Sequence, residues 1–255
     1  AFDSTVRDTE GDSVLQEAKD AGIPVIIVDR RVNVTDHSLY STWVGSNFLL
    51  EGRKACQWLK KFADIHHIPQ SDIKIVDIQG TTDASAQLGR TQGLTESAAA
   101  NGWKLLASEN GDFTQAKGQE VMKAFLNSYP ELNVVYCEND DEALGAIQAL
   151  RAAGKTIGTD IKHGEIMVLS FDATTAGLQE ALNGNITLDT ECNPLLGSRV
   201  KSIIKELEAG REPEKNIYVD EGMFSTDTSM SGVIVDNQEY KVTHLTDKVL
   251  NNRKY

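Results

Sequence analysis

The feature that most constrains the fold is a regular alternation of short apolar runs and longer amphipathic stretches along the 255 residues. Pro24–Val28 is a continuous apolar run, which is typical of a strand covered on both faces. It follows a helix-like stretch, Asp12–Ala21, which Gly22 closes at the position where helices favour glycine. Strands that alternate with helices build parallel sheets with right-handed crossovers. The sequence therefore predicts an α/β fold.

The same alternation continues through the rest of the chain. We expect further strands at 41–45, 73–79, 103–108, 134–137, 166–171 and 186–190. We expect helices over 47–63, 84–100, 115–129, 140–153, 174–183 and 195–209. From Ile217 the chain becomes strand-like and rich in loops. No Gly/Ser linker or block of charge divides the sequence, so composition alone places no domain boundary.

The charge balance excludes several classes of partner. The formal net charge is −13, from 38 acidic and 25 basic side chains. Such a surface repels the phosphates of nucleic acid and of anionic lipid, so we expect neither as a partner. No run of about eighteen apolar residues is present, which predicts no membrane insertion of this chain. The chain opens without a secretory signal, which a mature exported protein would already have lost.

Cysteine and histidine give no indication of a metal site or of catalysis. Cys56, Cys137 and Cys192 lack CxxC spacing, so we expect small buried side chains and leave a Cys137–Cys192 bridge open. The five histidines show no ligand spacing, and no nucleophile or phosphate-loop motif is present. We therefore expect no cofactor, no metal and no enzyme, with a glycosidase pair of carboxylates as the alternative.

Polar side chains follow several of the predicted strands at the point where each strand ends. They are Asp29 and Arg30, then Asn139, Asp172 and Glu191. In open parallel sheets, ligands bind beyond the carboxyl ends of the strands. The hydroxyls of a sugar are both donors and acceptors, and planar carboxylate, amide and guanidinium groups can engage two of them at once. The pattern thus points to a small polyhydroxylated ligand.

Four of these residues also have a purely structural interpretation. Asn139 and Asp172 stand just before predicted helices, where both residue types are favoured as N-caps. Asp29 and Arg30 could instead form an ion pair in a loop. The sequence alone leaves both alternatives open.

Three candidates remain, namely Arg90, Phe113 and Glu191. Arg90 lies near the start of a predicted helix, where the helix dipole does not favour a cation. Phe113 stands before another helix, where it could form a hydrophobic staple or cover the apolar face of a sugar ring. Glu191 is not needed as a cap, because Asn193 is the better cap and Pro194 suits the first helical position.

Five short motifs, each weak alone, occur in order across nearly the whole chain. They are residues 17–30, 44–53, 138–146, 170–172 and 191–197. Together they resemble the ribose-type group of periplasmic sugar-binding proteins of ABC importers. The last motif, Glu191-Cys192-Asn193-Pro194-Leu195-Leu196-Gly197, is similar to the galactofuranose-binding branch of that group.

The resemblance implies two Rossmann-like lobes with parallel sheets, joined by a hinge of three crossovers near Ser46, Glu191 and Asp220. The N-terminal lobe would comprise residues 1–46 and 192–220, and the C-terminal lobe residues 47–191 and 221–255. Members of the family begin with two strand–helix units that have no counterpart here, and Ala1–Thr5 corresponds to their third strand. We therefore expect an incomplete first lobe in this chain, either because the chain is a fragment of a longer mature protein or because the lobe itself lacks these units.

The resemblance also assigns roles to the candidate residues. Asp29 and Arg30 of the first lobe would hold ring hydroxyls, as would Arg90, Asn139 and Asp172 of the second, with Phe113 against the ring and Glu191 binding a hydroxyl near a crossover. The implied ligand is a monosaccharide, a pentose or hexose that can be in its furanose form. Hinge closure would capture it and an ABC permease would receive it. The implied location is periplasmic or extracellular, with a lipoprotein anchor as a variant.

Two other outputs of the same fold are alternatives. The effector-binding core of a LacI-type repressor shares the fold, but it would require a helix-turn-helix and a basic DNA-facing surface, and this sequence has neither. A sensing protein would use the same closure to signal to a chemoreceptor or kinase. The sequence does not separate sensing from transport.

Overall fold

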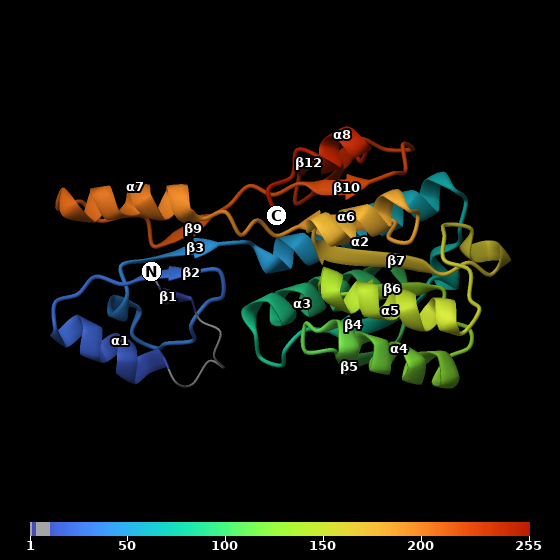
Figure 1. Ribbon diagram of the computed structural model, residues 1–255, viewed down its shortest axis with the longest axis horizontal. Coiled ribbons are helices and arrows are strands. Elements are labelled where there is room, and N and C mark those ends of the chain that lie inside the picture. Colours follow the sequence, from blue (N-terminus) through green and yellow to red (C-terminus); the bar gives the residue numbers. More distant parts are fainter. Residues whose placement is uncertain (1, 4–10) are drawn as a thin grey trace. The chain divides into compact units, whose positions relative to one another are not determined.

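The computed structural model describes residues 2–3 and 11–255, and the chain divides into two compact units (Figure 1). The smaller unit comprises residues 1–47, 83–86 and 193–220, and the larger comprises residues 48–82, 87–192 and 221–255. Of the predicted strand at Ala1–Thr5, β1 covers Phe2–Asp3, and the other residues lie outside the described part.

The smaller unit is a parallel sheet between two helices. Its strands are β1 (Phe2–Asp3), β2 (Ile26–Val28), β3 (Thr42–Gly45) and β9 (Asn216–Tyr218), in the order β1-β2-β3-β9. Leu15 of α1 (Gly11–Asp20) packs with Trp43 on one face, and Ile203 of α7 (Gly197–Glu208) packs with Val44 on the other. Trp43 is 1% exposed, so it is a core residue.

The larger unit contains an eight-stranded sheet in the order β11-β12-β10-β8-β7-β6-β4-β5. The strands are β4 (Lys74–Gln79), β5 (Lys104–Asn110), β6 (Val134–Cys137), β7 (Met167–Asp172), β8 (Leu188–Glu191), β10 (Met223–Ser225), β11 (Gly232–Val235) and β12 (Gln238–His244). Strands β4 to β8 are parallel, as predicted. The tail adds antiparallel pairs that the alternation did not predict, β10 with β8 and β11 with β12.

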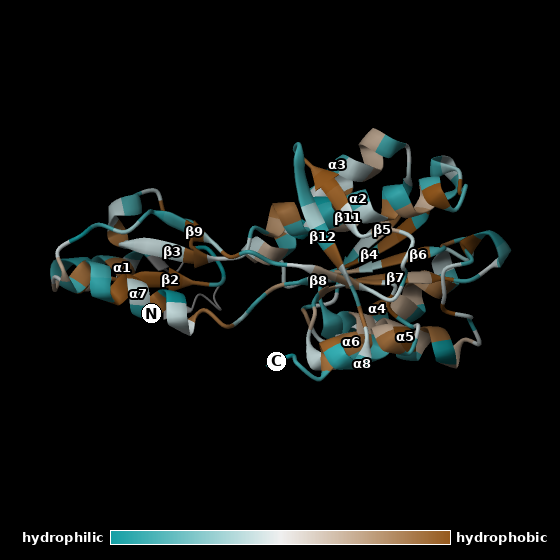
Figure 2. Cartoon of the chain, turned by 90° about the horizontal axis from the view of Figure 1, so that it is seen from above, coloured by the Kyte–Doolittle hydropathy of each residue, from teal (hydrophilic) through white to brown (hydrophobic). Residues whose placement is uncertain are grey.

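Helices cover both faces of this sheet, whose central strands are mainly apolar (Figure 2). Helices α2 (Phe48–Ile65) and α3 (Ser85–Asn101) pack on one face. Helices α4 (Gln115–Ser128), α5 (Asp140–Ala152), α6 (Thr175–Leu182) and α8 (Asp247–Leu250) pack on the other. Burial on both faces explains why the strands appear in the sequence as continuous apolar runs. Among the described residues, no helix is both long and apolar enough to cross a bilayer.

Two details of the sequence interpretation differ from the structure. Helix α7 begins at Gly197 with Leu196 as its N-cap, so the prediction of Asn193 as the cap was wrong. Asn193 Oδ1 instead accepts a hydrogen bond from the Leu195 amide at 2.9 Å. Cys137 and Cys192 are both free, which excludes the bridge that the sequence left open.

Candidate functional site

Arg90 of α3 is the centre of a buried hydrogen-bonded network in the larger unit. Its side chain is 2% exposed, its Nε donates to Glu51 Oε2 at 2.8 Å and its Nη2 donates to Asp172 Oδ1 at 3.2 Å. Its Nη1 donates to the carbonyl oxygen of Glu138. Burial acts to lower the pKa of Arg90, but the charges of Glu51 and Asp172 outweigh burial and hold that pKa above its usual value. The guanidinium is therefore charged and fixed.

The close approach of α2 and α3 brings Glu51 to Arg90. A Cβ atom added at Gly93 would lie 2.8 Å from the backbone nitrogen of Arg53, and one at Gly52 would lie 2.8 Å from the carbonyl oxygen of Arg90. Both distances are shorter than a van der Waals contact, so the two helices require glycine where they cross.

Asp172 ends β7 and presents its carboxylate beside Arg90. Its backbone φ is 100°, in the region that non-glycine residues avoid, and its side chain is 29% exposed. Burial raises the pKa of Asp172 to about 7, against the opposing charge of Arg90. The N-cap of α6 is Thr174, whose Oγ1 accepts from the Gly177 amide at 3.1 Å. The capping interpretation of Asp172 was therefore wrong, and its side chain remains available for another role.

Asn139 does cap α5, as one interpretation of the sequence predicted. Its Oδ1 accepts from the Glu142 amide at 2.9 Å, and its Nδ2 donates to the carbonyl oxygen of Phe113 at 3.2 Å. The side chain is largely buried, with 8% of the residue exposed. Asn139 thus connects the start of α5 with the loop that carries Phe113.

Phe113 lies in the turn between β5 and α4, with a backbone φ of 56°. Its amide donates to Glu142 Oε1 at 2.9 Å. A Cβ atom at Gly80 would lie only 1.9 Å from the Phe113 ring, so the ring packs directly on that glycine at the end of β4. Phe113, Asn139, Arg90 and Asp172 therefore form one connected set at the carboxyl ends of β4, β6 and β7.

Glu191 lies at the end of β8 in the same unit, but its carboxylate is occupied by protein donors. It accepts from Arg253 Nη1 at 2.7 Å, from Tyr255 Oη at 2.6 Å and from the Gly222 amide at 2.9 Å. Burial acts to raise the pKa of Glu191, but these hydrogen bonds and the Arg253 charge hold that pKa below its usual value. The carboxylate is thus ionised.

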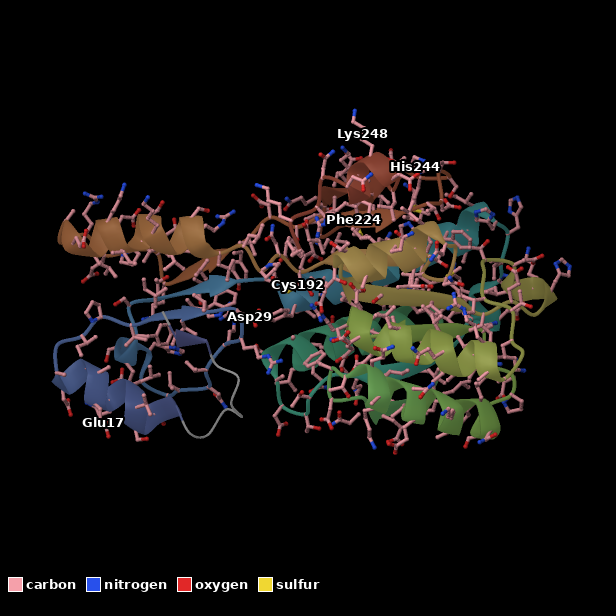
Figure 3. All side chains as sticks on the ribbon, viewed as in Figure 1. Glu17, Asp29, Cys192, Phe224, His244 and Lys248 are labelled. Carbon is pink, nitrogen blue, oxygen red and sulfur yellow. The ribbon has the colours of Figure 1, made fainter. Side chains whose placement is uncertain are left out.

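The remaining two predicted residues, Asp29 and Arg30, follow β2 in the smaller unit, and Figure 3 labels Asp29. Asp29 has a φ of 61°, its amide donates to the Val44 carbonyl at 3.0 Å and its carbonyl accepts from Trp43 Nε1 at 3.0 Å. The backbone that carries both side chains is therefore anchored to β3.

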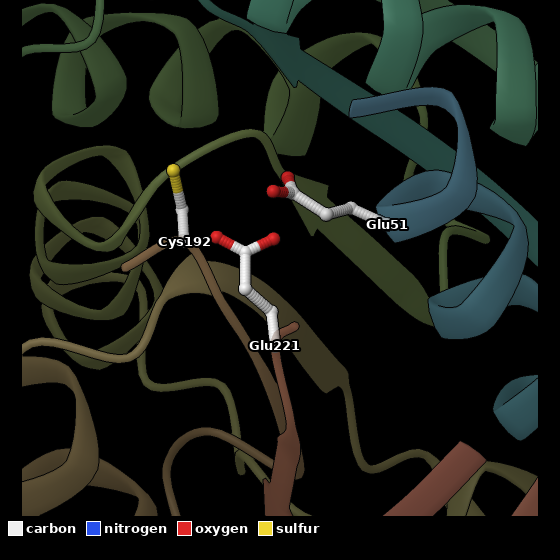
Figure 4. Close-up of side chains that lie close together, drawn as sticks. All are labelled: Glu51, Cys192 and Glu221. Atoms are coloured by element: carbon white, nitrogen blue, oxygen red, sulfur yellow. The ribbon is translucent and has the colours of Figure 1, made fainter. Parts of the chain in front are cut away.

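One cluster in the larger unit contains groups that could hold a metal ion. A carboxylate oxygen of Glu51, one of Glu221 and the Sγ of Cys192 all lie within 4.8 Å of one another (Figure 4). Arg90 already binds the Glu51 carboxylate, and Lys54 donates to the backbone carbonyl of Glu221 at 3.1 Å. Burial lowers the pKa of Lys54, and the charges of Glu51 and Glu221 oppose that shift. These basic groups neutralise the charge that a divalent cation would require.

Two residues that shape the site, Glu51 and Glu138, were not predicted as site residues, because their signals in the sequence are weak. Glu51 lies among buried residues of α2 and is 1% exposed, yet it appeared only as part of a family motif. Glu138 is buried and binds Arg90 through its carbonyl, and its Oε1 accepts from Thr91 Oγ1 at 2.5 Å. A carboxylate in an apolar run was the only available clue.

Parallel sheets flanked by helices, with hydrogen-bonding side chains at the carboxyl ends of their strands, define an α/β ligand-binding protein. The chain belongs to the periplasmic binding protein family, because the family model described as "Periplasmic binding protein domain" matches residues 4–190. Its fold is the type I fold of that family.

Known relatives include sugar-binding proteins. The chain is 34% identical to the galactofuranose-binding protein YtfQ of Escherichia coli (strain K12), over 89% of this chain and 70% of that protein. It is 31% identical to the ribose import binding protein RbsB of Salmonella typhimurium, over 71% of this chain and 56% of that protein. A Mycobacterium smegmatis structure in complex with β-D-fucofuranose matches with a TM-score of 0.80 and 40% identity, over 88% of this chain and 71% of that one.

Proposed function

We propose that this protein captures one monosaccharide between its two units by hinge closure and delivers it to an ABC importer. The units would be the two lobes, with boundaries near 46, 191 and 220. The observation that carries the proposal is the connected set of Arg90, Asp172, Asn139 and Phe113, which offers a fixed cation, an accepting carboxylate, an amide and an aromatic ring at one edge of a sheet. These are the groups that a sugar requires.

The two units have complementary roles in this proposal. Asp29 and Arg30 supply contacts from the smaller unit, and Arg90, Asn139, Asp172 and Phe113 supply contacts from the larger one. Only a ligand that touches both units stabilises a closed form, because a population shift requires contacts that the open form lacks. A micromolar Kd, about −8 kcal/mol, is the affinity expected for a small polar ligand of this kind.

Glu191 has a different role from the other candidates. Its carboxylate accepts three hydrogen bonds from the protein and its side chain is 12% exposed. We therefore propose that it acts near the hinge, with any sugar contact made through the lone pairs that Arg253 and Tyr255 leave.

The comparisons support a furanose form of the ligand. The YtfQ relative is named for galactofuranose, and the matching Mycobacterium smegmatis structure contains β-D-fucofuranose. The import function of the RbsB relative supports transport over the repressor alternative, as does the net charge of −13, which opposes binding to DNA. The location would be periplasmic or extracellular, with a lipoprotein anchor as a variant, and the protein would not act as an enzyme.

A thermal-shift panel of pentoses and hexoses tests this function. A sugar at 100 times its Kd stabilises the folded protein by about 2.7 kcal/mol, so the true ligand should raise the melting temperature clearly. The carbon-13 NMR spectrum of a C1-labelled ligand then reports the ring form that is bound. Recovery of the sugar unchanged after incubation supports a binding protein, whereas turnover would favour the glycosidase alternative. No shift with any monosaccharide would contradict the proposal.

A further inference from the structure

The turn that presents Asp172 has an unfavourable backbone conformation. Asp172 and Ala173 have φ values of 100° and 52°, both in the left-handed region that favours glycine. Two successive non-glycine residues keep such a conformation only when their surroundings over-determine it. The question is therefore what holds residues 172–174 in place.

Three side chains from distant parts of the chain bind the backbone of this turn. Asp189 Oδ1, from β8, accepts from the Ala173 amide at 3.0 Å. Asp140 Oδ2, from the start of α5, accepts from the Thr174 amide at 2.8 Å. Arg253 Nη2, from the segment after α8, donates to the Ala173 carbonyl at 2.7 Å. The Ala173 residue is thus held at both its amide and its carbonyl.

The two acids are buried, and both bind the backbone of the turn. Asp140 also accepts from Ser170 Oγ at 2.6 Å and from Thr174 Oγ1 at 2.7 Å, and these hydrogen bonds oppose the rise that burial causes in the pKa of Asp140. Asp189 is fully buried, and none of the described N–H or O–H groups donates to its Oδ2. Burial first, and then the charge of Asp140, raise the pKa of Asp189 well above its usual value. Burial and the nearby charge thus favour the protonated form of Asp189.

Arg253 is fixed as firmly as the two acids. Its Nη1 donates to Glu191 Oε1 at 2.7 Å, and its side chain is 11% exposed. Its guanidinium carbon lies 4.3 Å from the centroid of the Tyr255 ring and 4.9 Å from that of Phe224, distances at which a cation is attracted to an aromatic face. Because Nη1 binds Glu191 and Nη2 binds the Ala173 carbonyl, Arg253 joins the end of β8 to the turn.

We propose that Asp140, Asp189 and Arg253 are positioning residues that hold the 172–174 turn so that Asp172 faces Arg90 and the bound sugar. This inference rests on the proposed function, in which Asp172 contacts the ligand. The three residues would set affinity through Asp172, without touching the sugar themselves.

Amide hydrogen exchange tests, in the absence of any ligand, whether these side chains restrain the 172–174 turn. In the wild-type protein the Ala173 and Thr174 amides should exchange slowly, because each donates to a buried carboxylate. Arg253→Met removes the partner of the Ala173 carbonyl together with the hydrogen bond to Glu191, and should speed exchange at both amides by about tenfold. Arg151→Met is the matched control, because Arg151 binds Glu180 at the surface and not the turn. Unchanged exchange in Arg253→Met would overturn the proposal.

Sugar affinity tests whether the turn acts through Asp172. Arg253→Met should weaken binding by about tenfold or more in the wild-type background. In an Asp172→Asn background the same change should have little further effect, because residues that act through one another are not additive. An equal loss in both backgrounds would show a general structural role and overturn the proposal.

Asp189 offers a second pair of variants if Arg253→Met does not fold. Asp189→Asn keeps an oxygen that can accept from the Ala173 amide and introduces no charge, so it should bind sugar within about threefold of the wild type, whereas Asp189→Leu should lose about tenfold or more. Equal affinity of the two variants would contradict the proposal. If the wild-type protein binds no monosaccharide, the proposed function fails and the claim on affinity fails with it, while the exchange experiment still decides whether the turn is held.

Discussion

Arg90 and Glu51 form a buried ion pair, with Nε of Arg90 at 2.8 Å from Oε2 of Glu51 and side chains 2% and 1% exposed. The pair joins α3 to α2, and the same guanidinium reaches Asp172 at the end of β7. The proposed ligand-binding group is therefore also part of the core of the larger unit.

This relationship predicts that Arg90 supports the fold as well as the ligand. Arg90→Ala leaves the Glu51 carboxylate buried without its counter-ion, and breaking a buried pair in this way costs about 3–5 kcal/mol. Urea denaturation measures the loss. Glu51→Gln in the Arg90→Ala background should recover part of it, because the neutral amide removes the unpaired charge. Stability of Arg90→Ala within about 1 kcal/mol of the wild type would contradict the buried pair.

Gly80 predicts a way to displace the Phe113 ring without removing it. In Gly80→Ala the new Cβ would overlap the ring, so the ring must leave its place at the end of β4. We expect sugar affinity to fall about tenfold by calorimetric titration, because the ring no longer covers the ligand.

The matched control is Gly197→Ala, at the first residue of α7, where an added Cβ meets nothing within 4 Å. It should leave sugar affinity unchanged. If Gly80→Ala binds sugar as tightly as Gly197→Ala does, Phe113 has no part in the site.

Asp77 predicts a decline of stability as the pH rises. Asp77 is fully buried, and burial raises its pKa from the usual range of an aspartate to about 7. The Asp77 carboxyl group therefore binds its proton more tightly in the folded protein than in the unfolded chain. The stabilisation is therefore complete below the unfolded pKa and is lost as the pH rises toward the folded one. Between about pH 4 and pH 7, this group lowers the free energy of unfolding by up to about 1.4 kcal/mol per pH unit.

Urea denaturation at several pH values measures this slope. In Asp77→Asn the slope should fall by up to the contribution of one proton, which is about 1.4 kcal/mol per pH unit. The buried acids Glu138 and Glu142, whose pKa values burial also raises, should maintain the rest of the slope. The same slope in Asp77→Asn and the wild type would show that Asp77 does not take up a proton in this range.

The sequence predicted the elements of the fold better than their pairing in the tail. Continuous apolar runs such as Val134–Cys137 are unambiguous, because burial on both faces leaves no polar position to interrupt the pattern. The β11–β12 hairpin turns at Asp236 and Asn237, whose φ values of 49° and 65° suit a tight two-residue turn. That turn was not predicted, and the antiparallel pairing of β10 with β8 depends on contacts far apart in the chain.

The candidate site was predictable only in part, for a physical reason. A strand end marks where a side chain such as Asp172 stands, because the carboxyl ends of parallel strands share one edge. The position of a strand end does not show which other residues hold that side chain in place. Glu51, Asp189 and Arg253 come from α2, β8 and the chain after α8, and only the tertiary fold brings them to the network.

The most direct test of the central claim is a calorimetric titration of the protein with the sugar that the thermal-shift panel identifies. The two-unit account predicts one sugar per chain and a Kd near micromolar, with losses of about tenfold or more in both Asp29→Ala and Asp172→Asn. One variant changes the smaller unit and the other changes the larger. Binding that is insensitive to either substitution, or no binding at all, would contradict the claim that both units hold one ligand.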